Sequence, residues 1–217
     1  MRQPELDALL PPGIVAAVRY PEDGGSLDLL PEEQALLSPR AVPKRRLDFA
    51  LGRAAAHEAL RAFGVADEPI GKGPKGEPLW PAGIVGSISH CEGLAAAALA
   101  RVRRYRGLGL DVEPLDQALD QGVAERVCHP SELDIGPAEL TPMQRLLAVF
   151  SAKEAVYKAV FPVDRVFLDF LDAELRWLPG VCAFDAHMSK GSVRELRIRL
   201  GWFERWLVTA AGLAAEG

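Results

Sequence analysis

The segment from Arg145 to Val160 constrains the fold most, because it predicts a helix with two unlike faces. One stripe is apolar and can pack against a sheet; it holds Val149, Ala152, Val156 and Val160. A second stripe, at spacings of four, seven and eleven residues, holds Leu147, Ser151, Glu154 and Lys158. Taken alone, Glu154 and Lys158 are typical of an exposed helix pair worth a few tenths of a kcal/mol.

Composition limits what this helix can belong to. The chain has 217 residues, 49% of them apolar, which suits one large domain or two small ones with a real core. The net charge of −5 gives no electrostatic footprint for duplex nucleic acid, so we expect no nucleic-acid partner. Residues 1–107 carry a net charge of +1 and residues 108–217 carry −6, an asymmetry that suits a ligand with anionic groups and a bound cation.

The cysteines and the N-terminus indicate a cytoplasmic protein. Three widely separated cysteines provide neither a disulfide framework nor a zinc-binding spacing. The first 13 residues contain acidic residues and prolines where a signal peptide needs a basic start and an apolar run. No stretch reaches the roughly 18 apolar residues of a membrane helix, so we expect no membrane partner.

Periodicity and breakers predict two α/β blocks, residues 1–106 and 107–217. The first has a strand at 14–20, helices at 31–37 and 42–64 with Gly64 as C-cap, and strands around 84–90 and 94–100. Its loop GKGPKGEPLWPAG is dense in breakers. The second block opens with LGLDVEP, continues into the helix above and ends in strands around 168–178, 192–200 and 206–214. The joint is RVRRYRG, residues 101–107, whose arginines are most simply a solvated turn.

The strand LGLDVE places two carboxylates on one face. Side chains alternate along a strand, so Leu108, Leu110 and Val112 point one way and Asp111 and Glu113 point the other. Carboxylates this close either retain a proton or hold a cation between them. With Glu154 they provide three oxygen donors for a hard divalent cation such as Mg²⁺, although for the hexapeptide alone a strand with one solvated face is the better explanation.

The segment GSISHC, residues 86–91, follows a Gly-rich turn and can cradle a phosphate through hydroxyl, imidazole and backbone N–H groups. A serine hydrolase is a weak alternative, because the G-x-S-x-G elbow is absent and adjacent Ser89 and His90 point to opposite strand faces. A turn serine and a hydrogen-bonded core histidine remain the structural alternative.

Together, KGEPLWPAGIVGSISHC, GLDVEP and FSAKEAVYKAVFP resemble, in order and spacing, the 4′-phosphopantetheinyl transferases of the Sfp and EntD type. The resemblance runs from about Val42 to Leu175. It implies an α/β (α+β) fold of two similar subdomains related by a pseudo-twofold axis, with the active site between them. The N-terminal subdomain, 1–106, would bind the coenzyme A nucleotide, and the C-terminal subdomain, 107–217, the metal.

The implied reaction transfers phosphopantetheine from coenzyme A to a serine of an apo carrier protein of nonribosomal peptide, siderophore or polyketide synthesis. Adenosine 3′,5′-bisphosphate is released. The resemblance implies that Asp111, Glu113 and Glu154 hold Mg²⁺ against the pyrophosphate, with Asp111 also at the coenzyme. Glu154 would be the general base, Lys158 would stabilise the phosphates and Lys153 would assist it.

Five positions match family residues that bind the nucleotide end and the phosphates of coenzyme A: Arg45, Arg53, Lys75, Ser89 and His90. Glu132, where many relatives carry an acidic residue, stays outside the expected metal set. We expect a monomer whose apolar and basic patch near the metal receives the carrier, with RVRRYRG as a less favoured contributor. Two rival classes are a non-catalytic coenzyme A or carrier-binding protein and a metal-dependent phosphohydrolase.

Overall fold

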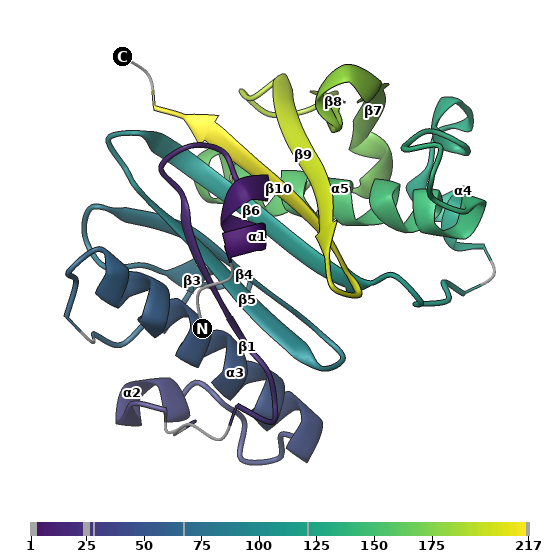
Figure 1. Cartoon of the computed structure of the whole chain (residues 1–217). Helices are drawn as coiled ribbons and strands as arrows, with labels where there is room; N and C mark the ends of the chain where they lie inside the picture. The colour runs from purple at the N-terminus through teal and green to yellow at the C-terminus, as the bar shows by residue number, and fades with distance from the viewer. Residues whose placement is uncertain (1–3, 24–26, 28, 67, 121, 216–217) are drawn as a thin grey trace.

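Two antiparallel sheets and two long helices make up the fold of the computed structural model (Figure 1). The structure describes residues 4–23, 27, 29–66, 68–120 and 122–215, so the outermost ends of the two predicted domains lie outside the described residues. Among the described residues, no helix combines the length and the apolar character needed to cross a membrane.

The N-terminal half is a three-stranded sheet covered by one helix. The sheet has the order β1-β5-β4, and its strands are β1 (Val15–Arg19), β4 (Ile84–Cys91) and β5 (Leu94–Arg101). The long helix α3 (Pro43–Ala62) packs its alanines and Leu60 against the sheet, and Gly64 follows it at φ +67°, as the predicted C-cap requires. The other elements of this half are α1 (Pro4–Leu9), α2 (Pro31–Gln34), β2 (Gly71–Lys72) and β3 (Pro78–Leu79).

The C-terminal half is a five-stranded sheet in the order β6-β10-β9-β8-β7, with the helix α5 (Pro142–Asp164) against it. Its strands are β6 (Tyr105–Pro114), β7 (Ala173–Leu178), β8 (Ala183–Met188), β9 (Glu195–Phe203) and β10 (Trp206–Ala214). Short helices α4 (Val123–Val127), η1 (Pro130–Glu132), η2 (Phe170–Asp172) and η3 (Pro179–Val181) connect them. Each half is therefore an antiparallel sheet under one long helix, which confirms the expected architecture of two similar α/β subdomains.

The predicted strands and long helices are present, although the strand predicted around 168–178 begins only at Ala173 and the helix predicted at 31–37 ends at Gln34. The small β2–β3 pair in the breaker-dense loop, the strand β8 and the helix α1 were not predicted. The joint at 101–107 is a tight turn between β5 and β6: Arg104 donates its amide to the Arg101 carbonyl, and β6 already begins at Tyr105.

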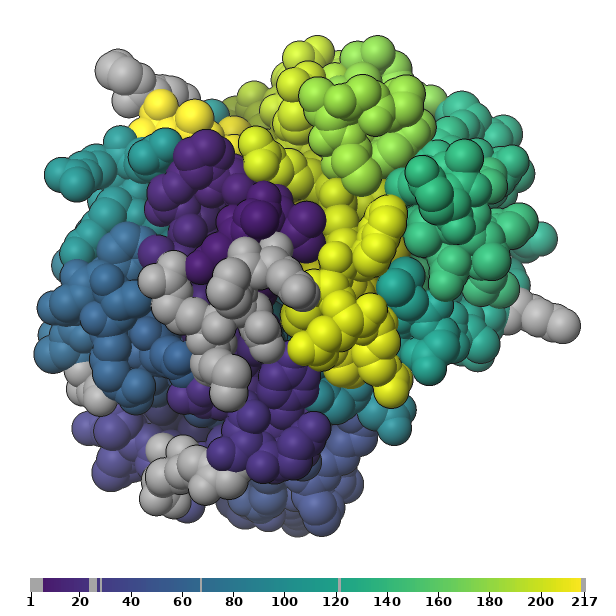
Figure 2. Space-filling model, in the orientation of Figure 1, coloured from purple at the N-terminus to yellow at the C-terminus, as the bar shows by residue number. Residues whose placement is uncertain are grey.

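The two halves share apolar packing. One core cluster joins residues of β1 and β5 to Leu108, Leu110 and Val112 of β6 and to Phe203 and Trp206. The N-terminal segment adds to this contact, since Arg199 of β9 donates to the Leu10 carbonyl at 3.4 Å. Figure 2 shows the purple N-terminal segment against the yellow C-terminal strands. The halves are thus held together by apolar packing and by the N-terminal segment.

Candidate active site

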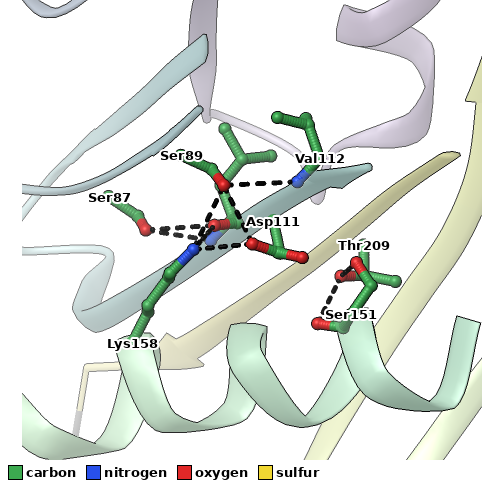
Figure 3. A network of polar contacts seen from close by, with 8 residues as sticks. Ser87, Ser89, Asp111, Val112, Ser151, Lys158 and Thr209 are labelled. Carbon is green, nitrogen blue, oxygen red and sulfur yellow. Dashed lines mark hydrogen bonds and ion pairs between the residues drawn. The ribbon is translucent and has the colours of Figure 1, made fainter. Parts of the chain in front are cut away.

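Asp111 lies at the centre of a polar network between β4, β6 and α5 (Figure 3). The side chain is 3% exposed. Its Oδ1 accepts hydrogen bonds from Ser89 Oγ at 2.8 Å and from Lys158 Nζ at 2.7 Å. Its Oδ2 is buried with no hydrogen-bond partner. The predicted alternative of a solvated strand face is wrong for Asp111, because the carboxylate is enclosed by protein.

Two glycines of β6 allow α5 to reach this position. A Cβ at Gly107 would collide with the Ala159 carbonyl oxygen, and one at Gly109 with that of Ala155. Only glycine lets the helix backbone come this close to the strand. The helix itself begins at a capping box in which Thr141 accepts from the Gln144 amide. Because Gly107 and Gly109 have no side chains, α5 lies close enough to β6 for Lys158 to reach Asp111.

The three acidic residues of the expected metal set interact electrostatically. Burial and the charge of Asp111 raise the pKa of Glu113 to about 8. Burial likewise raises the pKa of Glu154; the charge of Lys158 opposes this rise and that of Asp111 adds to it. Lys158 is a counter-charge for these carboxylates, but it does not prevent the rise in the pKa of Glu113 and Glu154, and Asp111 Oδ2 has no hydrogen-bond partner.

The donor chemistry therefore fits a hard cation such as Mg²⁺, although the side chains are not yet arranged around one. Among the described residues, no group of three His, Cys, Asp or Glu side chains is placed to hold a metal ion. The Lys158 ammonium instead lies on Asp111, where it supplies the positive charge.

A basic recess lies beside this network in the N-terminal half. A cavity of about 130 Å³ is lined by residues that include Arg45, Phe49, Lys72 and His90. An adjoining cavity of about 300 Å³ shares Arg45, Phe49 and Lys72 and adds Arg40 and apolar side chains. Arg45 approaches His90 at 3.4 Å. Cations around an aromatic ring suit a nucleotide with phosphate groups.

Arg53 lies beneath this recess and is 5% exposed. Its guanidinium donates to the Gly71 carbonyl at 3.1 Å, lies over the Phe49 ring and is 3.7 Å from the buried carboxylate of Glu33. Burial alone would raise the pKa of Glu33, but hydrogen bonds with His57 and the Ile70 amide, together with the electrostatic influence of His57 and Arg53, lower it overall. Arg53 thus forms the floor of the recess and is already held by protein partners.

A third cavity, of about 240 Å³, lies between the halves. Its lining includes Lys75 and Trp80 from the N-terminal half and Glu154, Lys158 and Phe161 from α5. An ion pair between Glu77 and Arg165, at 2.5 Å, also joins the halves in this region. The cavity brings Lys75, Glu77 and apolar side chains together with the two predicted catalytic groups, Glu154 and Lys158.

The sequence matches known proteins over most of its length. Residues 32–100 match the model of the 4′-phosphopantetheinyl transferase N-terminal domain, and residues 107–182 match that of the 4′-phosphopantetheinyl transferase superfamily. The chain is 42% identical to the 4′-phosphopantetheinyl transferase Svp of Streptomyces mobaraensis, across 96% of this chain and 89% of the relative. The chain belongs to the 4′-phosphopantetheinyl transferase superfamily.

Two further relatives of this transferase agree. The chain is 40% identical to 4′-phosphopantetheinyl transferase PptT of Mycobacterium tuberculosis, across 77% of this chain and 75% of the relative. It is 39% identical to enterobactin synthase component D of Salmonella typhimurium, across 81% and 74%. The expected enzyme class, transfer of phosphopantetheine, is confirmed, and neither rival class has support.

Two predicted coenzyme A contacts of the transferase need correction. Lys153 is 3% exposed; its Nζ donates to Glu132 at 2.6 Å and to the Val127 carbonyl at 2.7 Å. A buried ammonium with these partners is not available to a phosphate, so Lys153 does not assist Lys158. Ser89 is 4% exposed and its hydroxyl is held by Asp111 and Lys158, so it positions the carboxylate instead of reaching into the recess.

Other residues of the site were missed in the sequence. Lys72 lines both cavities of the recess, whereas the predicted Lys75 lines the cavity between the halves. The lysines lie in one breaker-dense loop, and only its folding into the β2–β3 pair separates their positions. Glu132, left outside the expected metal set, accepts from Lys153 and from the His129 and Leu175 amides, which gives it a structural role.

Proposed function

We propose that this transferase moves 4′-phosphopantetheine from coenzyme A to a serine of an apo carrier protein of nonribosomal peptide, siderophore or polyketide synthesis. Adenosine 3′,5′-bisphosphate is the second product. The observation that carries the proposal is the basic recess beside the three carboxylates, together with Lys158, which contacts Asp111 and lines the cavity between the halves. A nucleotide with a pyrophosphate and a long uncharged arm suits a basic recess, a neighbouring acidic metal site and a cavity with apolar side chains.

Coenzyme A would span the described cavities. We place its adenine and 3′-phosphate in the recess of Arg45, Lys72 and His90. Its pyrophosphate then lies near Lys158, and its pantetheine arm enters the cavity of about 240 Å³ lined by Trp80 and Phe161. The arm carries no charge, which suits this apolar lining.

Asp111, Glu113 and Glu154 would hold Mg²⁺ in this arrangement, where the ion supplies positive charge to the pyrophosphate. Asp111 Oδ2 is the ligand atom already available to it.

The chain's own residues then account for the transfer. The carrier serine oxygen bonds to the β-phosphorus, and the bond from that phosphorus to the bridging oxygen breaks, so the bridging oxygen leaves with the adenosine bisphosphate. Glu154 accepts the serine proton, and its raised pKa makes it a better base than an exposed carboxylate. Lys158 donates to the phosphate oxygens as charge accumulates on them.

The carrier protein approaches from the other side of Glu154. A cavity of about 150 Å³ there is lined by Glu154, Tyr157, Phe167 and Phe170. Phe167 is strongly exposed, and an apolar carrier side chain suits this surface. Both halves of the site come from one chain, which supports a monomer, and the free cysteines suit the cytoplasm.

The test is to mix the protein with apo carrier proteins, coenzyme A and Mg²⁺ and to weigh the carriers by intact mass spectrometry. We expect each accepted carrier to gain one phosphopantetheine. If several peptidyl and acyl carriers all remain unmodified, the proposal is wrong. Hydrolysis of coenzyme A without a change in carrier mass would indicate the phosphohydrolase instead.

The base assignment is tested with Glu154→Gln, which keeps the shape and removes the proton acceptor. We expect transfer to fall by about 10² to 10⁴-fold. Glu195→Gln, on the exposed side of β9, is the matched control and should transfer normally. Full activity of Glu154→Gln would show that another group takes the proton.

A further inference from the structure

The two sheets meet through strands that do not share a backbone ladder. β4 is an edge of the three-stranded sheet and β6 an edge of the five-stranded sheet. Figure 1 shows both strands in the middle of the molecule. Within the described part of the chain, these two edges belong to separate sheets, so their contact depends on side chains.

Two serine hydroxyls of β4 make this contact (Figure 3). Ser87 Oγ accepts from the Leu110 amide at 3.0 Å and donates to the Leu110 carbonyl at 3.4 Å. Ser89 Oγ accepts from the Val112 amide at 3.4 Å and donates to Asp111 Oδ1. We call these bonds the hydroxyl seam. Because the paired residues advance together along both chains, the two strands run in the same direction.

The hydroxyl seam links the two parts of the proposed site. On the N-terminal side, His90 follows Ser89 directly and lines the basic recess. On the C-terminal side, Asp111 belongs to the acidic set and lies between the two residues that the serines bind. The offset between β4 and β6 therefore sets the offset between the nucleotide and the carboxylates.

Ser87 makes no hydrogen bond to the acidic set, although it lines the cavity proposed for the pantetheine arm. It is 3% exposed, and both hydrogen bonds of its hydroxyl go to the Leu110 backbone, whose carbonyl also accepts from Lys158. Without the hydroxyl, the buried amide and carbonyl of Leu110 would lose this hydrogen-bond partner. Because unsatisfied buried polar groups are costly, we expect β6 to shift relative to β4. The shared apolar cluster of β5 and β6 would still hold the halves together.

We infer that Ser87 is a positioning residue whose hydroxyl sets the register between the two halves, so that coenzyme A held by the basic recess presents its pyrophosphate to the acidic residues. The inference rests on the proposed function. It predicts that loss of the Ser87 hydroxyl should impair transfer from coenzyme A, which contacts both halves, and spare the binding of a ligand that contacts only the N-terminal half.

The experiment compares Ser87→Ala with wild type using two ligands. Adenosine 3′,5′-bisphosphate contains the nucleotide end alone, and its Kd is measured by calorimetry without carrier. Transfer from coenzyme A, which needs both halves, is measured as kcat and KM. We expect kcat/KM to fall by about 10- to 100-fold, mainly in kcat, because misplacement of about 1 Å costs about 10²-fold. The Kd of the bisphosphate should change by less than about threefold.

Thr209→Val is the matched control. Thr209 is a buried residue whose hydroxyl lies 2.8 Å from Ser151 Oγ and donates to the Ser151 carbonyl at 2.9 Å, so its bonds lie within the C-terminal half. The control should lower Tm while leaving kcat/KM within a few fold. Ser87→Cys, which fills similar space with a weak hydrogen-bonding group, is measured alongside and should follow Ser87→Ala.

The outcomes separate the two claims. If wild type modifies no carrier, the proposed function fails before any variant is compared. If wild type is active, the inference is overturned when both Ser87 variants keep normal kcat/KM, when they lose the bisphosphate as strongly as they lose transfer, or when Thr209→Val loses as much activity. Should Ser87→Ala not fold, Ser87→Cys decides by the same criteria.

Discussion

Replacement of Gly109 by alanine tests how the active site is assembled. An added Cβ would lie 2.8 Å from the Ala155 carbonyl carbon and 3.0 Å from the Ala159 nitrogen, and it would collide with the Ala155 carbonyl oxygen. All three atoms are helix backbone, which cannot rotate away as a flexible side chain can. Helix α5 must therefore move off β6.

The size of the effect follows from that displacement. Ordinary contact begins at 3.4 Å, so α5 must retreat by a good fraction of an ångström at least. Overpacking of this kind costs about 1 to 3 kcal/mol, and for a chain of this length about 2 to 4 °C of Tm per kcal/mol. Because Glu154 and Lys158 move with the helix, a shift of about 1 Å should also lower kcat by about 10²-fold.

The assay is thermal unfolding followed by carrier modification at a temperature where the variant is folded. Gly180→Ala is the control, since a Cβ there meets nothing within 4 Å, and it should keep normal Tm and kcat. A folded Gly109→Ala protein with normal kcat would refute the reasoning, because Glu154 and Lys158 would then not depend on the close approach of α5.

Three further predictions concern charge. The pKa of Glu33 is lowered, so the stability that this carboxylate contributes is present above its ordinary pKa of 4.5 and is lost as pH falls through the lowered pKa. Glu33→Gln should therefore be less stable at neutral pH, and its stability should fall less steeply in acid. An acid unfolding profile identical to that of wild type would contradict this. Mg²⁺ should raise the Tm of wild type by relieving the repulsion among the carboxylates, and Asp111→Asn should lose most of that shift in a thermal melt; an equal shift in both would argue against this site. Replacement of Arg103 and Arg104 by glutamate should leave the KM for the carrier unchanged, since the turn precedes β6 while Asp111 and Glu113 lie near the end of that strand; a several-fold rise in KM would restore the turn as a docking element.

Local pattern was sufficient for most elements. Alternation predicted β6 and its acidic face, and two stripes predicted α5, because side-chain direction within one element follows its own geometry. The strand β8 and the β2–β3 pair were missed for different reasons. FDAHM alternates apolar and polar side chains over five residues, so the signal for β8 was present and was overlooked. GK and PL are too short to carry an alternation, and only their pairing with each other makes them strands.

Sequence by itself determined the family, because three ordered segments with fixed spacing are specific, and it predicted Asp111, Glu154 and Lys158 as active-site residues. It did not determine which groups meet across the chain. Only the tertiary structure showed that Lys153 is buried against Glu132 and that Ser89 holds Asp111. The physical reason is that periodicity orients a side chain relative to its own helix or strand, whereas its partner comes from packing with residues far away in the chain. Gly107 and Gly109 of β6, to which the sequence pattern assigned no role, determine that packing because they allow α5 to approach closely.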